Sequence, residues 1–280
     1  MIPLVSVVVP TRNSGRTIEA CLVSIRGQTV HGIEVVVVDN GSTDNTVEIA
    51  RKYADRVQAG GPERSAQRNL GARLATGQYL LFIDSDMVLE RNVVAECIEA
   101  SSPPVYPPVV IPEVTIGEGF WSRCRTLERN CYQGDNLVEA ARFFSRTVFQ
   151  EHGGYDEGLT GPEDWDLSLR ASRGRPPSRI RSKIFHDEGR VRLVALLAKK
   201  RYYAASFPAY WRKHGSLGIR QVNIVLRPAF IREWRALGRQ PLLAMGIFTL
   251  KFLEAGAALW GIIDGRSGSR SRPRGSGRVA

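Results

Sequence analysis

Two carboxylates stand directly after a strongly apolar stretch of the chain. Tyr79 to Ile83 is a run of five apolar residues, and Asp84, Ser85 and Asp86 follow it. Such a run, with helical patterns on either side, indicates a central strand of a parallel sheet covered on both faces. Ligands bind outside the carboxyl ends of these strands, and two hard oxygen donors beside a phosphate pocket suit Mg²⁺ or Mn²⁺. The sequence therefore predicts a divalent-metal site here; the alternative is an aspartate that only caps a helix or closes a turn.

A second group of acids lies further along the chain. Glu163, Asp164 and Asp166 surround Trp165, behind a glycine-rich loop over residues 153–158. Pro162 suits the first turn of a helix, where unpaired N–H groups favour acids, so a helix start alone explains this group. The functional alternative is a general base: an Asp beside Trp165, whose ring can stack on a sugar face, takes a proton from an acceptor hydroxyl.

The elements that must hold these acids alternate between strand and helix. Apolar, β-branched runs predict strands, and helical periodicity after capping residues predicts helices. Because crossovers between parallel strands are right-handed, the alternation predicts an α/β fold with a doubly wound, mostly parallel sheet. The predicted strands are 4–9, 33–38, 79–83, 137–145 and one that ends near 186, and the predicted helices are 18–25, one that opens at 43–46, 64–75 and 120–131.

A dinucleotide-binding fold is the obvious competitor, but its glycine turn is missing. After the first strand the chain reads Pro10-Thr11-Arg12-Asn13-Ser14-Gly15, without the G-x-G-x-x-G that lets a backbone approach a pyrophosphate. We therefore expect no NAD site. Arg12, Arg64 and Arg68 are candidates for phosphate or base contacts, although arginines that solvate a helix surface are equally common.

Composition indicates one substantial core with an appendage of opposite charge. The 280 residues carry a net charge of +11; residues 1–178 hold 18 Lys and Arg against 23 Asp and Glu, whereas 179–280 hold 21 against 5. A cationic end favours anionic partners. The four cysteines show no metal-binding or redox spacing, which predicts a reducing compartment without zinc or disulfides. The first nine residues lack a basic n-region and predict a strand rather than a signal peptide.

The basic end combines aromatic, cationic and apolar residues. Lys199 to Arg201 reads as a cationic turn, and aromatic residues follow it, beginning with Tyr202 and Tyr203. This composition is typical of a helix at a membrane interface, and equally of a helix packed on the catalytic domain with a solvated basic edge. Residues 267–280 are rich in Gly, Ser and Arg, which predicts a disordered basic tail.

Pro241 to Ile263 is long and apolar enough to cross a bilayer. Lys251 and Glu254 fall near its middle, and each costs roughly 2.5–3.5 kcal/mol at the centre of a lone spanning helix. The two are three residues apart and can pair. We therefore expect a re-entrant or interface-lying helix, or one docked on a partner copy, in preference to a simple span.

In this order, the motifs of the chain resemble those of the inverting, membrane-associated family 2 glycosyltransferases with the GT-A fold. The resemblance covers roughly residues 4–186, and its specificity comes from five pieces that occur in the family's order. They are Val7–Asn13, Val36–Asp44, Ala66–Ala72, Phe82–Asp86, and Gly153–Glu157 followed by Glu163–Trp165.

The resemblance implies a role for each matching residue. Asp39 reads the nucleobase, and Asp86 holds Mg²⁺ or Mn²⁺ on the donor's diphosphate. Asp84 lies beside the ribose or sugar and within reach of the metal, and Asp164 is the base. His186 is a further candidate ligand of metal or phosphate, with a structural histidine as the alternative. The other residues expected at the nucleotide are Pro10, Thr11, Arg12, Arg68 and Ser85.

The expected activity is inverting, metal-dependent transfer of a hexose from GDP-mannose or a UDP-hexose to a lipid-linked glycan, polyprenyl phosphate or polysaccharide. Inversion requires that Asp86 and Asp164 open onto one cavity from opposite sides. We expect a catalytic domain at 1–190, a helical membrane-associating region at 191–265 and a tail at 266–280, attached peripherally or monotopically to an anionic surface on the cytoplasmic side of the cell membrane. The rivals are a non-catalytic nucleotide-sugar-binding relative and a nucleic-acid-binding protein; the acidic cleft and the absence of a recognised nucleic-acid module disfavour the second.

Overall fold

The computed structural model describes residues 4–222 and 227–269, and its centre is a seven-stranded sheet. The strand order is β3-β2-β1-β4-β8-β6-β9, in which β3, β2, β1 and β4 are mutually parallel and β8 is antiparallel to both of its neighbours. The predicted α/β fold with a mostly parallel sheet is confirmed. The strands are β1 Val5–Thr11, β2 Ile33–Asp39, β3 Arg56–Ala59, β4 Tyr79–Phe82, β6 Val109–Val110, β8 Phe143–Ser145 and β9 Ser178–Arg179.

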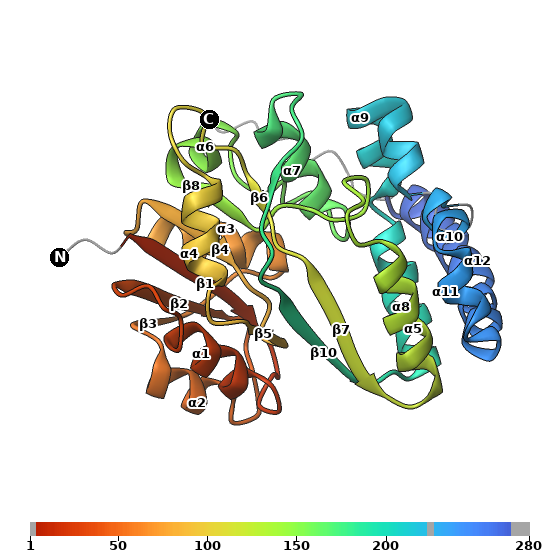
Figure 1. The fold of residues 1–280 in the computed structure, drawn as a ribbon, viewed down its shortest axis with the longest axis horizontal. Helices are drawn as coiled ribbons and strands as arrows, with labels where there is room; N and C mark the ends of the chain where they lie inside the picture. The colour runs from red at the N-terminus through yellow and green to blue at the C-terminus, as the bar shows by residue number, and fades with distance from the viewer. Residues whose placement is uncertain (1–3, 223–226, 270–280) are drawn as a thin grey trace, which may run out of the picture.

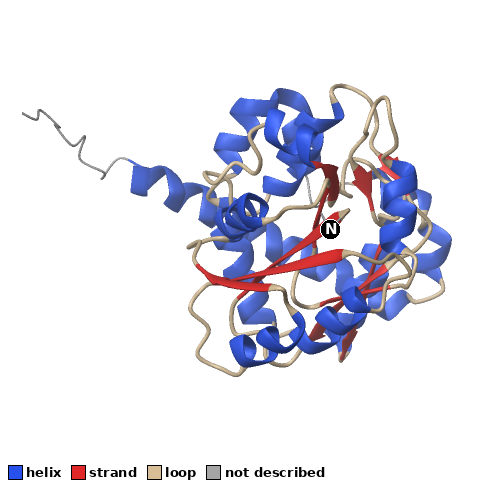
Figure 2. Cartoon of the chain, turned by 90° about the vertical axis from the view of Figure 1, so that its left-hand side faces the viewer, coloured by secondary structure: helices blue, strands red, loops and turns tan. Residues whose placement is uncertain are grey.

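Helices cover both faces of this sheet, as Figure 2 shows. Valines of β1 point alternately to the two sides: Val7 and Val9 pack with α1, α2 and α4, whereas Val8 packs with α3, α6 and α7. Burial on both faces explains why β1, β2 and β4 read as continuous apolar runs. The helices are α1 Ile18–Arg26, α2 Thr46–Tyr53, α3 Arg64–Leu74, α4 Val93–Ala100, α6 Arg146–Glu151 and α7 Glu163–Ser172.

A second, three-stranded sheet with the order β5-β10-β7 lies beside the first. It consists of β5 Met87–Leu89, β7 Glu113–Glu118 and β10 Ile184–Arg190, and β10 is antiparallel to β5 and parallel to β7. Two sequence predictions need correction here. His186 lies inside β10 rather than at its end, and the strand predicted at 137–145 begins only at Phe143, because the chain turns over residues 136–138.

The C-terminal helices form a layer of their own at one side of the molecule (Figure 1). Helix α12 packs along α8 and α5, and apolar side chains from α5, α10, α11 and α12 share one cluster. Residues 199–201, predicted as a turn, lie within α8. The helices are α5 Phe120–Cys131, α8 Leu193–Ala204, α9 Phe207–Val222, α10 Pro228–Arg232, α11 Trp234–Gly238 and α12 Pro241–Ser269.

The last helix brings its two central charges inside the protein. Lys251 Nζ donates to Glu254 Oε2 at 2.8 Å, which confirms that these residues pair, and both side chains are buried. Helix α12 continues to Ser269, beyond the predicted boundary at 265. The rest of the predicted tail, 270–280, lies outside the described residues.

Candidate active site

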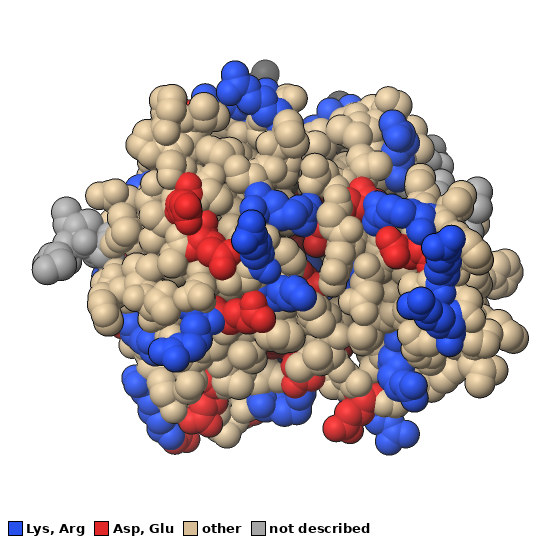
Figure 3. All heavy atoms as spheres, in the orientation of Figure 1, with Lys and Arg blue, Asp and Glu red and all other residues tan. Residues whose placement is uncertain are grey.

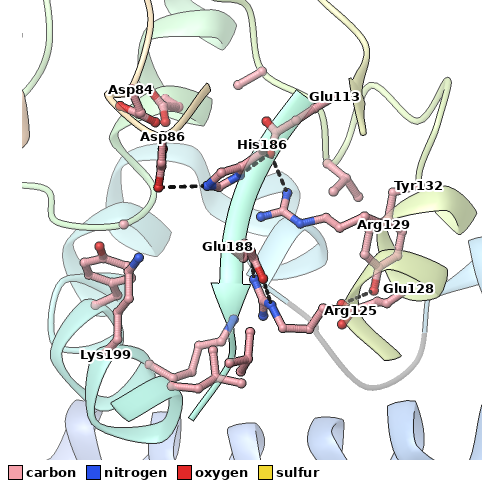
Figure 4. Close-up of a pocket in the computed structure, with 18 of the residues that line it drawn as sticks. Asp84, Asp86, Glu113, Arg125, Glu128, Arg129, Tyr132, His186, Glu188 and Lys199 are labelled. Atoms are coloured by element: carbon pink, nitrogen blue, oxygen red, sulfur yellow. Dashed lines mark hydrogen bonds and ion pairs between the residues drawn. The ribbon is translucent and has the colours of Figure 1, made fainter. Parts of the chain in front are cut away.

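A cavity of about 610 Å³ lies between the second sheet and the C-terminal helices. Asp84, Asp86 and Asp164 all line it, as do Trp165 and His186 (Figure 4 labels the first two and His186). The acid after β4 and the acid beside Trp165 therefore open onto one cavity. A shared cavity is one part of the geometry that inverting transfer requires of Asp86 and Asp164, and their placement on opposite sides of a sugar stays a prediction.

Asp84 is held by two arginines. Its Oδ1 accepts a hydrogen bond from Arg68 Nη2 at 2.7 Å, and its Oδ2 lies 3.5 Å from Arg142 Nη1. Burial alone would raise the pKa of Asp84, but the charges of Arg68 and Arg142 hold this pKa well below its ordinary value. Asp84 is therefore a permanently charged group at the rear of the site.

Asp86 is the more accessible of the two carboxylates, with 40% of its side chain exposed. Its Oδ2 lies 3.2 Å from His186 Nε2, and His186 Nδ1 lies 2.8 Å from Glu113 Oε1 on β7 (Figure 4). Burial would lower the pKa of His186, but its bonds to Asp86 and Glu113 raise this pKa to about 9. Asp86, in the turn before β5, and His186, on β10, are thus neighbours, and Glu113 orients the imidazole from behind.

Arg68 joins the two acidic motifs. Its side chain is 0% exposed, and while Nη2 binds Asp84, Nη1 donates to Asp164 Oδ1 at 2.8 Å. The guanidinium also lies 5.1 Å from the centre of the Tyr155 ring. Among the described residues, Arg68 is not part of the cavity lining; it lies behind Asp84 and Asp164 and contacts both.

Glu163 and Asp164 are adjacent in the chain but differ in burial. Glu163 is buried and lies 3.2 Å from Arg64; burial and the neighbouring Asp164 raise the pKa of Glu163. Asp164 keeps 27% of its side chain exposed and faces the cavity. Next to it, Trp165 Nε1 donates to the Val138 carbonyl at 2.7 Å, which fixes the ring in the cavity wall.

The residues predicted at the nucleotide lie along a neighbouring part of the sheet edge. Thr11 and Asp39 are paired across β1 and β2, and Asp39 accepts hydrogen bonds from Ser42. Ser85 Oγ donates to Ser14 Oγ at 2.8 Å, which ties the loop after β4 to the loop after β1. Among the described residues, five of those predicted at the nucleotide are not part of the lining of the 610 Å³ cavity: Pro10, Thr11, Arg12, Asp39 and Ser85.

The family follows from comparison with known proteins. A family model described as glycosyl transferase family 2 matches residues 6–149. This chain belongs to that family. A curated relative, the PGL/p-HBAD biosynthesis glycosyltransferase of Mycobacterium bovis, is 31% identical to the transferase over 184 residues, which cover 60% of the chain and 69% of the relative.

Solved structures show the same fold at low identity. The mannosyltransferase of Pyrobaculum calidifontis, solved with GDP-Man and Mn²⁺, superposes with a TM-score of 0.62 at 19% identity, over 94% of this transferase and 88% of that chain. TarS of S. aureus gives 0.53 at 16% identity, over 95% and 91%. These likenesses confirm the predicted GT-A fold.

Several charged residues of the transferase's cavity were missed by sequence reasoning. Arg142 and Glu113 pair at 3.2 Å behind Asp84 and His186, although they are 29 residues apart in the chain. Lys199 of α8 enters the cavity opposite His186 (Figure 4), and burial and the charge of Arg64 lower its pKa. Glu113 is the first residue of β7, which was not predicted, and Arg142 directly precedes β8, so sequence reasoning had no signal for this pair.

Asp86 and His186 suit a hard divalent ion that takes part of its coordination from elsewhere. A partly exposed carboxylate and an oriented imidazole are side by side, and Mn²⁺ and Mg²⁺ complete such sites with water and substrate phosphate. Among the described residues no group of three or more His, Cys, Asp or Glu forms a complete ligand set. The protein alone therefore supplies only part of the ligand set, which suits an ion that binds together with the substrate.

Proposed function

We propose that this transferase moves a hexose, with inversion, from a nucleotide-diphosphate sugar to a lipid-linked or glycan acceptor, and that it depends on Mg²⁺ or Mn²⁺. The observation that carries the proposal is the shared cavity of Asp86 and Asp164. The candidate donors are GDP-mannose, by likeness to the mannosyltransferase solved with GDP-Man, and a UDP-hexose, by likeness to TarS solved with UDP-GlcNAc.

On the donor side, the turn before β5 and the strand β10 carry the residues that prepare a site for the leaving diphosphate. A divalent cation, when bound, supplies the positive charge that offsets the charge building on the departing phosphate. Asp86 and His186 would hold it, and Glu113 keeps the imidazole turned toward Asp86. Lys199 and Arg64 line the same cavity and add positive charge to its wall.

Asp164 is the proposed base. Its Oδ1 is occupied by Arg68, whereas Oδ2 has no hydrogen-bond partner in the part of the chain that the structure describes, and so can accept the proton of an acceptor hydroxyl. Arg68 also binds Asp84, so a single buried side chain sets the position of the base relative to the donor side. Trp165 offers a flat apolar surface next to the base for a sugar ring.

The proposed place of work is the cytoplasmic surface of the cell membrane, with an anionic lipid surface and a lipid-borne acceptor as partners. Within the described residues one helical segment, Pro241–Asp264, is long and apolar enough to cross a membrane. The proposed division into a catalytic part, 1–190, and a helical part, 191–265, has a functional corollary. Leu196 and Lys251 line the cavity, so the helical part completes the acceptor side.

Donor turnover by purified protein tests this function. With Mn²⁺ present, GDP-mannose and UDP-hexoses are screened for release of the nucleoside diphosphate, and binding is followed by thermal shift, where ligand at 100 times Kd stabilises by about 2.7 kcal/mol. We expect Asp164→Asn to lower turnover of the active donor by about 10²–10⁴-fold, and Asp86→Ala to lower it strongly as well. Turnover that neither change lowers refutes the assignment, and nucleotide binding without wild-type turnover would support the non-catalytic alternative.

A further inference from the structure

Helix α12 is apolar on both sides apart from its two central charges, and those charges face the protein rather than water. The face against the protein carries its charges, Lys251 and Glu254, whereas the outer face carries large apolar side chains, with Phe252 79% and Leu242 73% exposed. The outer positions recur at helical spacing. The exposed apolar residues of this outer stripe are Leu242, Met245, Phe248, Phe252, Leu259 and Trp260.

The inner face of α12 is covered along its length by other helices. Near its start, Gly246 lies against Cys124 and Phe120 of α5, where a Cβ would come within 2.4 Å of the Cys124 sulfur. Near its end, Gly261 lies against the backbone of Arg201 in α8, where a Cβ would come within 2.0 Å of the carbonyl oxygen. These contacts are about 22 Å apart along the helix.

The neighbours of α12 carry charges that cannot enter hydrocarbon. Lys251 Nζ lies 2.5 Å from Glu128 of α5, and Glu254 lies 3.5 Å from Lys200 of α8. Since α5 and α8 run beside α12, a membrane-crossing α12 would carry these groups into the bilayer with it. Only the outer stripe is free of charge, so α12 can lie flat on a membrane but cannot cross it.

Cationic and aromatic side chains flank the stripe at both ends. In α10 and α11, which precede α12, Ile231 and Trp234 are exposed beside Arg232 and Arg235, and the Arg235 guanidinium lies 5.4 Å from the Trp234 ring centre. At the far end, the Arg201 guanidinium lies 3.9 Å over the Trp260 ring. Figure 3 shows Lys and Arg on this side of the molecule, as well as over the rest of the face drawn. Aromatic residues beside arginines suit the headgroup level of an anionic bilayer, whereas two copies placed stripe to stripe would bring like charges together.

The geometry points to an in-plane membrane anchor: α12 lies flat in the interface of an anionic bilayer, with its outer stripe in the acyl boundary, and does not span it. This inference rests on the proposed function at a membrane surface, and it specifies how the protein is oriented on that surface. Lys251 lies on the inner side of α12 and lines the cavity. The cavity therefore begins about one helix diameter, ~10 Å, from the bilayer, within reach of the headgroup of a lipid-borne acceptor.

Vesicle flotation of the full chain tests the surface. We expect the wild type to float with phosphatidylcholine–phosphatidylglycerol vesicles, and a triple variant, Phe248→Ser, Phe252→Ser and Leu259→Ser, to lose at least tenfold in partition coefficient. The matched control changes three exposed apolar residues far from the stripe in sequence, Val23, Val105 and Ile116, to Ser and should float like the wild type. Unchanged circular dichroism and thermal melting establish that each variant is folded.

If a second copy of this chain covered the outer stripe instead of a membrane, the measurements would give a different result. Sedimentation velocity without lipid would then show a dimer that the stripe variant dissociates, and vesicles would bind neither protein; this outcome overturns the proposal.

Orientation is tested with single cysteines at Leu242 and Leu259, about 25 Å apart along the helix. The four native cysteines are buried, so a fluorescent NBD label goes to the new thiol. With protein added outside sealed vesicles, an in-plane helix lets external dithionite reduce both labels at similar rates. Protection of one label until detergent is added would mean a span and overturn the proposal.

Neither measurement needs turnover. If the protein transfers sugar but does not bind vesicles, only the proposed membrane contact of α12 is rejected. If α12 lies flat on vesicles but the protein shows no turnover, only the proposed function is rejected.

Discussion

Replacing Arg68 by Gln removes a buried cation that contacts both acidic motifs. In the wild type its guanidinium is fully buried, with donors 2.7 Å from Asp84 and 2.8 Å from Asp164, and 3.6 Å from Glu163. A glutamine cannot reach both carboxylates or supply charge. The variant therefore leaves negative groups in a poorly solvated site without their main partner.

The expected cost is large. Breaking a buried ion pair by removing one partner destabilises by roughly 3–5 kcal/mol, a substantial fraction of a total stability of about 5–15 kcal/mol. For a chain of this size, this loss corresponds to a fall of ~10 °C in Tm. Arg68→Lys, which keeps the charge but not the two-pronged geometry, should lie between Gln and the wild type.

The loss should also depend on pH. The folded-state pKa of Asp84 is depressed, so its contribution to the free energy of unfolding is present above its unfolded pKa and is lost as the pH falls through the folded pKa. Without Arg68 the folded pKa rises. The difference in free energy of unfolding between the wild type and the variant should therefore be largest at pH 7. It should become smaller in the acid range, where Asp84 of the variant becomes protonated.

Urea unfolding of both proteins at pH 7 and at successively lower pH measures these effects. The matched control is Lys52→Gln, which removes a cation from an exposed pair, Lys52–Glu48 at 3.2 Å, and should cost less than about 1 kcal/mol. If Arg68→Gln costs no more than this control, or if its deficit is the same at every pH, the assigned role of Arg68 is wrong.

Three further predictions follow from the site and its supporting helices. Asp164→Asn should lower kcat by about 10²–10⁴-fold with little change in donor KM, as expected for loss of a general base; an equal rise in KM would indicate a binding role. Glu113→Gln should weaken Mn²⁺ binding about 10–100-fold, because it replaces the charged partner of His186 Nδ1 by a neutral amide; Mn²⁺ titration by EPR in the presence of nucleoside diphosphate measures this, with Glu139→Gln as control. Lys251→Met should cost roughly 3–5 kcal/mol by leaving Glu128 and Glu254 without their shared cation, and adding Glu254→Gln should recover part of the loss; thermal melting that shows no recovery would contradict a coupled cluster.

The sequence by itself determined the catalytic part of the chain to a large extent. Runs such as Val35–Val38 and Tyr79–Phe82 are apolar because both faces of a central strand are buried, and this signal is local. The position of Asp84 and Asp86 at a strand end follows from the same signal. Short strands without periodicity, such as β3, β5 and β7, gave no comparable pattern and were missed.

The tertiary structure decided which charges work together. Arg68 pairs with residues 16 and 96 positions away, and His186 contacts Glu113, which is 73 positions away. Contacts between residues so far apart in the chain produce no sequence spacing from which they could be predicted. The same holds for α12: its sequence is apolar on both sides apart from Lys251 and Glu254. Which side faces the protein depends on where Glu128 and Lys200 lie in the fold, because a buried charge must find its partner.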